Sequence, residues 1–304
     1  MTVLAIPVES NEYLFSYHGV ATHYLHSSAL PDLENRLSEL TFKDYADLQE
    51  RFTIINATIE EFVTGLPHDQ PMQLAGDVRK AIDECFAYDT IEKIIKALDS
   101  VAAGSNEALQ SWATKTKKTI LDRSPTSVKV TLKEMQLGKN WTIDQAFQRE
   151  YHIASVFMEG HEFVEGVSAR LIKKPAETPH WQPSTIDAVS MDDVDRYFTT
   201  RGQEQLQLYN RGPSATYLRY PHAWIGLPTE KDVQEVVEQG GKGRKDVLKH
   251  FYQLKEGKLG VKEKVQEILA RKTTVKEGSL LWDFAADEHD ANLSRGSREP
   301  NNRR

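Results

Sequence analysis

Residues 45–62, YADLQERFTIINATIEEF, decide the fold class of this chain. Apolar side chains recur along this stretch at alternating steps of three and four residues: Tyr45, Leu48, Phe52, Ile55, Ile59 and Phe62. This spacing places them on one face of an α-helix, which Gly65 and Pro67 are expected to end. The same period continues over most of the chain, so the sequence predicts a mainly α fold.

Cap residues divide the rest of the chain into further helices. We expect helices through Leu74, Val78, Ile82 and Phe86; from Asp89, with Ile91, Ile94, Ile95 and Leu98 on one face; from Ser105 through Leu109, Trp112 and Ile120; from Ser124 and Pro125 to Gly138; from Thr142, with Gln145 in a capping box, through Phe147, Tyr151, Ala154 and Phe157; from Ser190 over 192–197; and over 230–238, 245–254 and 261–271. At most one or two short strands are predicted, at 3–8 and 20–25 near the N-terminus.

The composition is that of an ordinary globular protein. The 304 residues are 39% hydrophobic and 27% charged, with a formal net charge of -7. This acidic balance argues against a protein whose main function is to coat nucleic acid or acidic membranes, although a local basic patch is left open. No apolar run of about 18 residues occurs, so no membrane span is predicted. The single Cys85 excludes an intramolecular disulfide and is expected to serve in packing.

The N-terminal segment does not resemble a mitochondrial transit peptide. Residues 1–13 contain Glu9 and Glu12 and neither Arg nor Lys, whereas transit peptides are rich in Arg and poor in acidic residues. No transit peptide is therefore visible in this sequence.

Two catalytic sequence patterns are either incomplete or absent in this chain. His161 and Glu162 begin like a metalloprotease helix, but Glu165 stands where the second imidazole is needed, so no metal site is predicted. The serine nucleophile pattern G-x-S-x-G is absent, and no catalytic residue is assigned.

Two further patterns could contact phosphate. Residues 240–245, GGKGRK, lack the Walker pattern and are interpreted as an interhelical linker. Residues 115–139 hold seven basic residues against Asp122 and Glu134. This basic stretch either contacts phosphate or RNA or forms a solvated helix face.

Three ordered blocks carry a resemblance to a known family. Residues 19–24 (GVATHY), 124–127 (SPTS) and 160–167 (GHEFVEGV) are similar to signatures of the 3-hydroxyisobutyryl-CoA hydrolases, which belong to the crotonase (enoyl-CoA hydratase/isomerase) superfamily. The match continues through Ala169, Leu171, Ile172, Lys174, Pro179 and Trp181, and it extends in all from Gly19 to Phe198. Tail segments at 220–221, 226–230 and 260–265 resemble fungal members of this family.

The resemblance implies the C-terminal helical part of a crotonase-type α/β fold. Family members hydrolyse 3-hydroxyisobutyryl-CoA in mitochondrial valine breakdown, and they use two backbone N–H groups as an oxyanion hole together with acidic side chains. Those groups lie upstream of the first block, and only eighteen residues precede Gly19. We therefore expect that the catalytic half is missing and that this chain alone is inactive. No cofactor is implied.

Lys173 and Lys174 are the substrate-binding residues that the resemblance implies. In related crotonases a lysine shortly after the Glu-Gly pair reaches the CoA phosphates, and these two lysines occupy that place. The alternative is an exposed lysine pair at a helix end.

The resemblance leaves two functions open, both of them mitochondrial. The first is acyl-CoA thioester hydrolysis, with an acyl-CoA substrate as the partner once the core is supplied. The alternative is a structural component of the small subunit of the mitochondrial ribosome, as some fungal relatives are. The predicted segments are 1–25, a remnant of the crotonase core; 26–198, the helical C-terminal region; 199–286, a helical fungal-type tail; and 287–304, a disordered tail.

Overall fold

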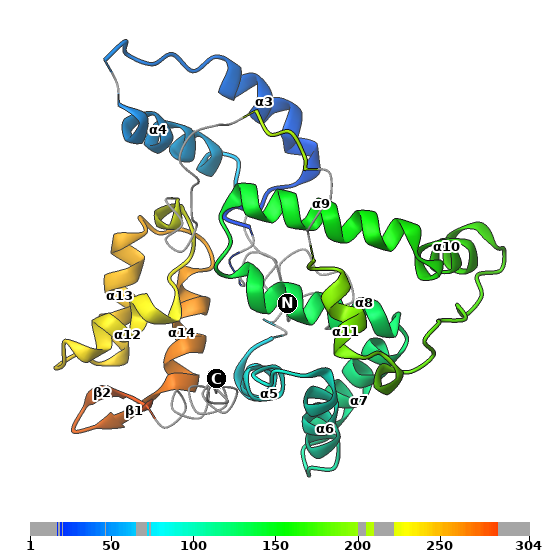
Figure 1. Ribbon diagram of the computed structural model, residues 1–304. Coiled ribbons are helices and arrows are strands. Elements are labelled where there is room, and N and C mark those ends of the chain that lie inside the picture. The colour runs from blue at the N-terminus through cyan, green and yellow to red at the C-terminus, as the bar shows by residue number, and fades with distance from the viewer. Residues whose placement is uncertain are drawn as a thin grey trace, which may run out of the picture. The chain divides into compact units, whose positions relative to one another are not determined.

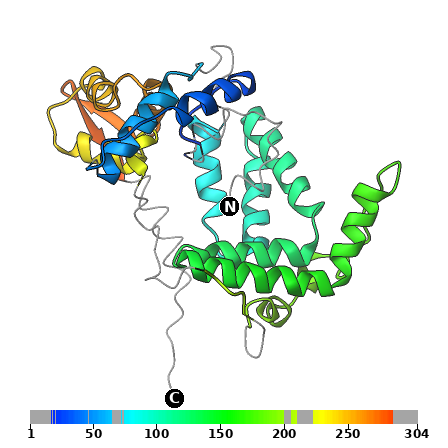
Figure 2. The same ribbon diagram turned by 90° about the horizontal axis from the view of Figure 1, so that it is seen from above.

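The computed structural model describes residues 21–45, 47–64, 74–199, 205–209 and 222–284, together with residues 17, 19 and 72. The described chain is mainly helical (Figures 1 and 2), which confirms the predicted fold class. It forms two compact units: unit 1 contains residues 1–8, 81–220 and 289–304, and unit 2 contains residues 9–80 and 221–288. The predicted segments 1–25, 26–198, 199–286 and 287–304 rest on family resemblance rather than on contacts, and they stay a prediction.

Unit 1 is built from helices joined by short turns. Its elements are α5 (Gly76–Phe86, which begins in unit 2), α6 (Ile91–Ala102), α7 (Glu107–Leu121), α8 (Pro125–Gly138), α9 (Ile143–Glu159), α10 (His161–Val167), the π-helix η2 (Ser168–Ile172), the 3-10 helix η3 (Ile186–Ala188) and α11 (Met191–Arg196). Figure 2 shows α10 leaving the end of α9 in a new direction, at Gly160, whose extended backbone separates the two helices.

Three predicted helix starts in unit 1 are confirmed. Ser124 accepts the N–H of Ser127 at 3.0 Å, with Pro125 in the first turn of α8. Thr142 begins α9 with the predicted capping box, and Ser190 begins α11. These side chains satisfy N–H groups that have no acceptor within the helix.

Two other predicted starts are wrong by one residue. The cap of α6 is Thr90 and not Asp89, since its hydroxyl accepts the N–H of the third helical residue at 3.3 Å. The cap of α7 is Asn106 and not Ser105, since its side-chain oxygen accepts two N–H groups at 3.1 and 3.3 Å. In both cases the next residue in sequence is also of a favoured cap type.

The core of unit 1 lies around α6, α7 and α8. Figure 1 shows α6 and α7 side by side. The buried cluster consists of Cys85, Ile91, Ile94, Leu98, Ala113, Ile120, Leu132 and Ile186. Burial raises the pKa of the Cys85 thiol to about 11, so this cysteine packs in the core as a neutral thiol.

The predicted apolar face of α9 is largely exposed. The side chains of Phe147 and Tyr151 are 54% and 43% exposed, whereas His152 and Ile153 of the same helix are buried. Within the described residues α9 therefore contacts the core through Ile153 and Phe157, and of these two the periodicity indicates only Phe157.

Unit 2 contains the helix that the opening stretch predicts. Its elements are η1 (Ser27–Ala29), α3 (Leu30–Ser38), α4 (Leu48–Glu60), η4 (Ala223–Ile225), α12 (Glu230–Glu238), α13 (Arg244–Leu254), α14 (Val261–Lys272), β1 (Thr273–Lys276) and β2 (Ser279–Trp282). Asp47 caps α4, and Thr229 caps α12 with the predicted bounds of 230–238. Gly65 and Pro67 lie outside the described residues.

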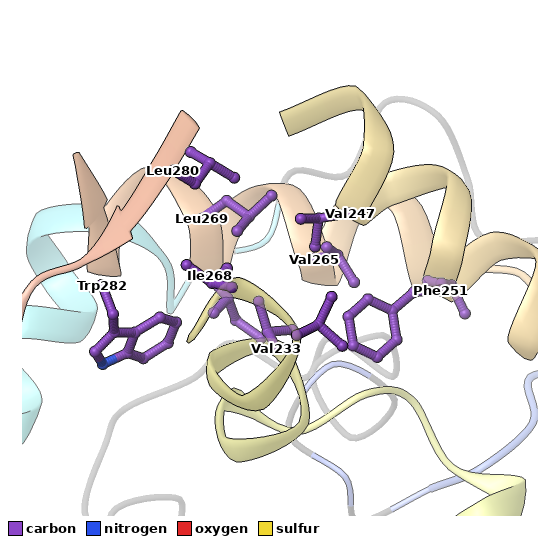
Figure 3. Close-up of a cluster of buried hydrophobic side chains, with 11 residues drawn as sticks. Val233, Val247, Phe251, Val265, Ile268, Leu269, Leu280 and Trp282 are labelled. Atoms are coloured by element: carbon purple, nitrogen blue, oxygen red, sulfur yellow. The ribbon is translucent and has the colours of Figure 1, made fainter. Parts of the chain in front are cut away.

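The core of unit 2 joins α12, α13, α14 and β2. Figure 3 shows its side chains converging from these elements: Val233, Val236, Val237, Val247, Phe251, Val261, Val265, Ile268, Leu269, Leu280 and Trp282. The α14 members repeat at steps of four, three and one, which is the spacing of one helix face. All eleven are at most 7% exposed, so this is a fully formed core.

The strands lie at the opposite end of the chain from the predicted ones. β1 and β2 pair antiparallel, with Thr273 opposite Trp282 and Lys276 opposite Ser279. Of the predicted strands, 3–8 lies outside the described residues, and the described part of the other, 21–25, is not a strand.

Candidate functional site

A cavity of about 410 Å³ in unit 1 adjoins two of the three sequence blocks. Its wall combines apolar side chains of α5 to α8 with Ser124 and Ser127 of the second block, Gly166 of the third, and Trp181, which follows it; Arg123 and Arg170 also line it. The lining contains no Asp, Glu, His, Cys or Lys among the described residues.

A buried hydrogen bond holds the second and third blocks together. The Ser124 hydroxyl donates to Glu162 Oε2 at 2.6 Å while it caps α8. Glu162 is 9% exposed, and its other carboxyl oxygen has no partner among the described residues. Burial raises the pKa of the nearby Tyr197 hydroxyl, and the Glu162 charge adds to this shift. The second and third blocks are therefore one structural unit.

The third block also explains why the match continues to Trp181. A Cβ atom at Gly166 would lie 3.0 Å from the Trp181 ring, a closer contact than most side chains make, so glycine favours this approach. Glu165, the residue before Gly166, accepts the N–H of His180 at 2.7 Å. That hydrogen bond holds the pKa of the Glu165 carboxyl below its ordinary range. Gly166 and Glu165 position the segment that closes one side of the cavity.

The first block lies in unit 2, where it binds α4. His23 Nε2 lies 3.1 Å from Glu60 Oε1, and Lys258 also pairs with Glu60. Thr22 Oγ1 is 2.9 Å from His23 Nδ1. Burial opposes ionisation of Glu60, but His23 and Lys258 outweigh it and hold the Glu60 pKa below its ordinary value.

Lys173 and Lys174 lie at the end of η2, and neither lines the 410 Å³ cavity. Lys173 pairs with Glu177 at 2.6 Å, and this hydrogen bond raises the Lys173 pKa. Lys174 is exposed and makes no ion pair within the described residues. The two predicted binding residues therefore differ in their availability to a ligand. A phosphate would have to displace Glu177 from Lys173, whereas Lys174 has no such competitor among the described residues.

In the part of the chain that the structure describes, the other chemical patterns of the sequence lie outside the 410 Å³ cavity or contribute no acidic or metal-binding group to it. Among the described residues, no group of three His, Cys, Asp or Glu side chains could hold a metal ion. The 240–245 segment contains most of the turn between α12 and α13, where Gly240 and Gly241 have positive φ angles, and it ends in the first two residues of α13. In the basic stretch 115–139, Lys117, Lys129 and Lys133 each pair with a carboxylate, which reduces its net positive charge: their partners are Asp99, Glu92 and Asp195.

Sequence comparison identifies the class of this chain. Residues 10–198 match the family model for enoyl-CoA hydratase/isomerase. The chain therefore belongs to the enoyl-CoA hydratase/isomerase family, as the three blocks predict. In the part that the structure describes, no helix combines the length and hydropathy needed to cross a bilayer.

Individual relatives carry two kinds of name. A "small ribosomal subunit protein mS47" of Neurospora crassa is 43% identical over 267 residues, which are 86% of this chain and 52% of that protein. The Arabidopsis thaliana protein of that name is 34% identical over 60% of this chain and 42% of its own length. A mitochondrial 3-hydroxyisobutyryl-CoA hydrolase of Danio rerio is 30% identical over 62% of this chain and 46% of that enzyme.

The chain spans about half the length of the curated relatives it matches. Of these three relatives, the one whose name states a compartment is mitochondrial, in agreement with the predicted location.

Sequence reasoning found the blocks but missed the contacts between them. The sequence predicts Ser124 as a helix cap, yet no local pattern indicates that its hydroxyl also reaches Glu162, 38 residues further on. The approach of Trp181 to Gly166 is likewise a tertiary contact. A glycine inside a helical block is the one local signal that could have indicated such an approach.

Proposed function

We propose that this protein is a structural component of a small ribosomal subunit in mitochondria and not an enzyme in its own right. The observation that supports this proposal most directly is the length of the chain that each relative matches. The Neurospora crassa mS47 protein matches 86% of this chain, whereas the Danio rerio hydrolase matches 62%. The longer match extends over more of the chain than residues 10–198, to which the family model is confined.

Exposed apolar side chains on unit 1 support a role in an assembly. Besides Phe147 and Tyr151 of α9, the exposed set includes Phe163, Val164, Leu171 and Ile172 of α10 and η2. Large apolar side chains left in water are favoured at protein–protein contact sites, where a partner removes them from water.

Co-sedimentation tests this proposal. A tagged full chain expressed in mitochondria should sediment with the small ribosomal subunit and stay there after a high-salt wash. Leu171→Ser with Ile172→Ser should weaken the association. Leu281→Ser, at an exposed site on β2 in unit 2, is the matched control. Recovery of the chain only in the soluble matrix fraction contradicts the proposal.

The second candidate is acyl-CoA thioester hydrolysis after a catalytic half is supplied. The observation in its favour is the 410 Å³ cavity between blocks that resemble hydrolase signatures. In this case Lys174, and Lys173 to a lesser degree because of Glu177, would contact the CoA phosphates.

Joining the chain to the upstream half of a hydrolase relative distinguishes between the two candidate functions. If the second one holds, the fusion releases thiol from 3-hydroxyisobutyryl-CoA, and Lys174→Ala raises KM while it leaves kcat unchanged, because the lost contact is the same in the ground and transition states. A large fall in kcat contradicts the phosphate role of Lys174.

A further inference from the structure

A second cavity, of about 380 Å³, lies within unit 2. Three segments that the sequence analysis singled out meet at its wall: Gly19 of the first block, residues 227–230 of the tail, and Lys264 of the 260–265 segment. Arg79 and Lys231 line it as well. The wall is therefore rich in cationic groups, although the chain as a whole is acidic.

Lys264 is a buried cation without a hydrogen-bonding partner in the described part of the chain. It is 9% exposed, and its ammonium makes neither a hydrogen bond nor an ion pair within the described residues. Burial lowers its pKa and Arg79 adds to this effect, while the charges of Glu267 and Glu230 offset it only in part. An ammonium removed from water without a partner destabilises a protein, and a bound anion would offset that cost.

The first turn of α12 adds backbone donors to the same wall. The capping box uses the N–H groups of Thr229 and Asp232, at 2.8 and 3.2 Å from their acceptors. The N–H groups of Glu230 and Lys231 make no hydrogen bond in the described part of the chain, as expected for the first helical turn. Glu230 and Lys231 both line the cavity. Such N–H groups favour a negatively charged ligand.

The single carboxylate of the wall is already neutralised. Glu230 lies 2.6 Å from Arg271 Nη2 and 3.4 Å from Arg79 Nη2. Lys231 is 3.9 Å from its nearest carboxylate, Glu235, a long and exposed contact. The positive charges of Lys264 and Lys231 therefore remain for a ligand.

From this arrangement we infer that the unit 2 cavity binds a phosphate group, held by Lys264, Lys231 and the two N–H groups that begin α12. A phosphate suits these donors better than a carboxylate, because it has more acceptor oxygens and up to two charges, and the donors come from two helices. The volume also admits a group attached to the phosphate. The ligand is then either a small phosphorylated molecule or a backbone phosphate of RNA. The inference is independent of the proposed ribosomal role.

Calorimetric titration of the full chain with inorganic phosphate, at constant ionic strength in chloride, tests the site. The wild type should bind phosphate saturably. Lys264→Met should weaken binding by about 10- to 100-fold, the effect of losing one charged hydrogen-bond donor. The same variant should melt no lower than the wild type, because it removes a buried unpaired charge. Lys249→Met, on the exposed surface of α13, is the control with the same charge change and should bind like the wild type.

Two additional measurements make the outcome decisive. Lys231→Gln, at a surface position, must also weaken phosphate binding, which keeps the test valid if Lys264→Met misfolds. A short single-stranded RNA then identifies the natural source of the phosphate group. If the RNA competes with inorganic phosphate, the ligand is an RNA backbone; if phosphate binds and the RNA does not compete, the ligand is a small molecule. Absence of saturable phosphate binding by the wild type, or equal affinity in all variants, overturns the inference.

Discussion

At the residue scale, the contact between Ser124 and Glu162 shows why two blocks distant in sequence belong together. One hydroxyl accepts the Ser127 N–H as the cap of α8 and donates to a buried carboxylate at the start of α10. A residue with two such roles is more sensitive to substitution than an ordinary cap, because its loss also leaves a buried charge without its donor.

Ser124→Ala should therefore destabilise unit 1 by about 2–4 kcal/mol, the sum of a lost cap and an unsatisfied buried carboxylate. Asn106→Ala is the control, since Asn106 caps α7 from an exposed position and should cost about 1 kcal/mol. Denaturant unfolding measures both variants. Equal losses would show that the Glu162 contact adds nothing.

Glu60 makes the stability of unit 2 depend on pH. Its pKa in the folded protein is below the ordinary 4.5, because His23 and Lys258 outweigh the effect of burial. The folded state thus favours the carboxylate, and the resulting stabilisation is present above pH 4.5 and is lost as the pH falls through the lowered pKa.

Glu60→Gln should lower the melting temperature at neutral pH and flatten its fall below pH 4.5, where the wild type loses the Glu60 contribution. Melting curves across this range check the effect. Glu61→Gln, which changes the same charge at an exposed neighbour, should keep the slope of the wild type. A parallel slope for Glu60→Gln and the wild type would remove Glu60 as the cause.

At the element scale, the β-hairpin depends on an unfavourable turn. Glu277 and Gly278 join the strands with φ angles of 51° and 80°. Glycine adopts such angles without strain, whereas a residue with a Cβ atom such as glutamate does so at a cost. Two-residue hairpin turns of this kind favour Asn-Gly.

Glu277→Asn should stabilise unit 2 by about 0.5–1 kcal/mol, because asparagine tolerates the left-handed conformation better. Gly278→Ala should have the opposite effect, because alanine is strained at a φ of 80°. Thermal unfolding of both variants provides the measurement, and destabilisation by Glu277→Asn would mean that the glutamate side chain has a stabilising contact.

Local chemistry explains which elements were predictable from sequence. The starts of α8, α9, α11 and α12 follow from cap residues that bond within one turn, so a short window suffices. The Glu277-Gly278 turn lacks the usual asparagine, and the hairpin was missed. The buried side of α9 depends on which helices cover it, and no single-helix pattern contains that information. The two cavities were missed for the same reason.

The exposed face of α9 should promote self-association. Phe147→Ser with Tyr151→Ser should reduce hydrophobic-dye binding and aggregation of the isolated chain and should lower its melting temperature less than a core truncation, since about half of each side chain is exposed. Ile153→Ala is the contrasting variant, because Ile153 is 5% exposed and its truncation should cost about 2–5 kcal/mol. A monomeric wild type that binds no dye would contradict this expectation.

At the scale of the whole molecule, we expect the 304-residue chain to hydrolyse no 3-hydroxyisobutyryl-CoA above background. Thioester hydrolysis needs a group that manages the proton of the attacking water, and the described lining of the 410 Å³ cavity offers hydroxyls and guanidinium groups but no carboxylate or imidazole. Thiol release from purified protein is the measurement. Saturable activity would require a new catalytic group, beginning with His161, Glu162 and Glu165.

The two-part origin of unit 2 determines when it can form during synthesis. Its residues come from 9–80 and from 221–288, and residues 81–220 between them belong to unit 1. At about 5–20 residues per second, the early segment waits roughly 10–40 s for its partner to be made. Unit 1 can fold in that interval, while the apolar side chains of α4 stay accessible on the nascent chain. A chaperone that shields short helical segments would therefore act on this protein before translation ends, and slow codons after residue 80 would lengthen the period of risk.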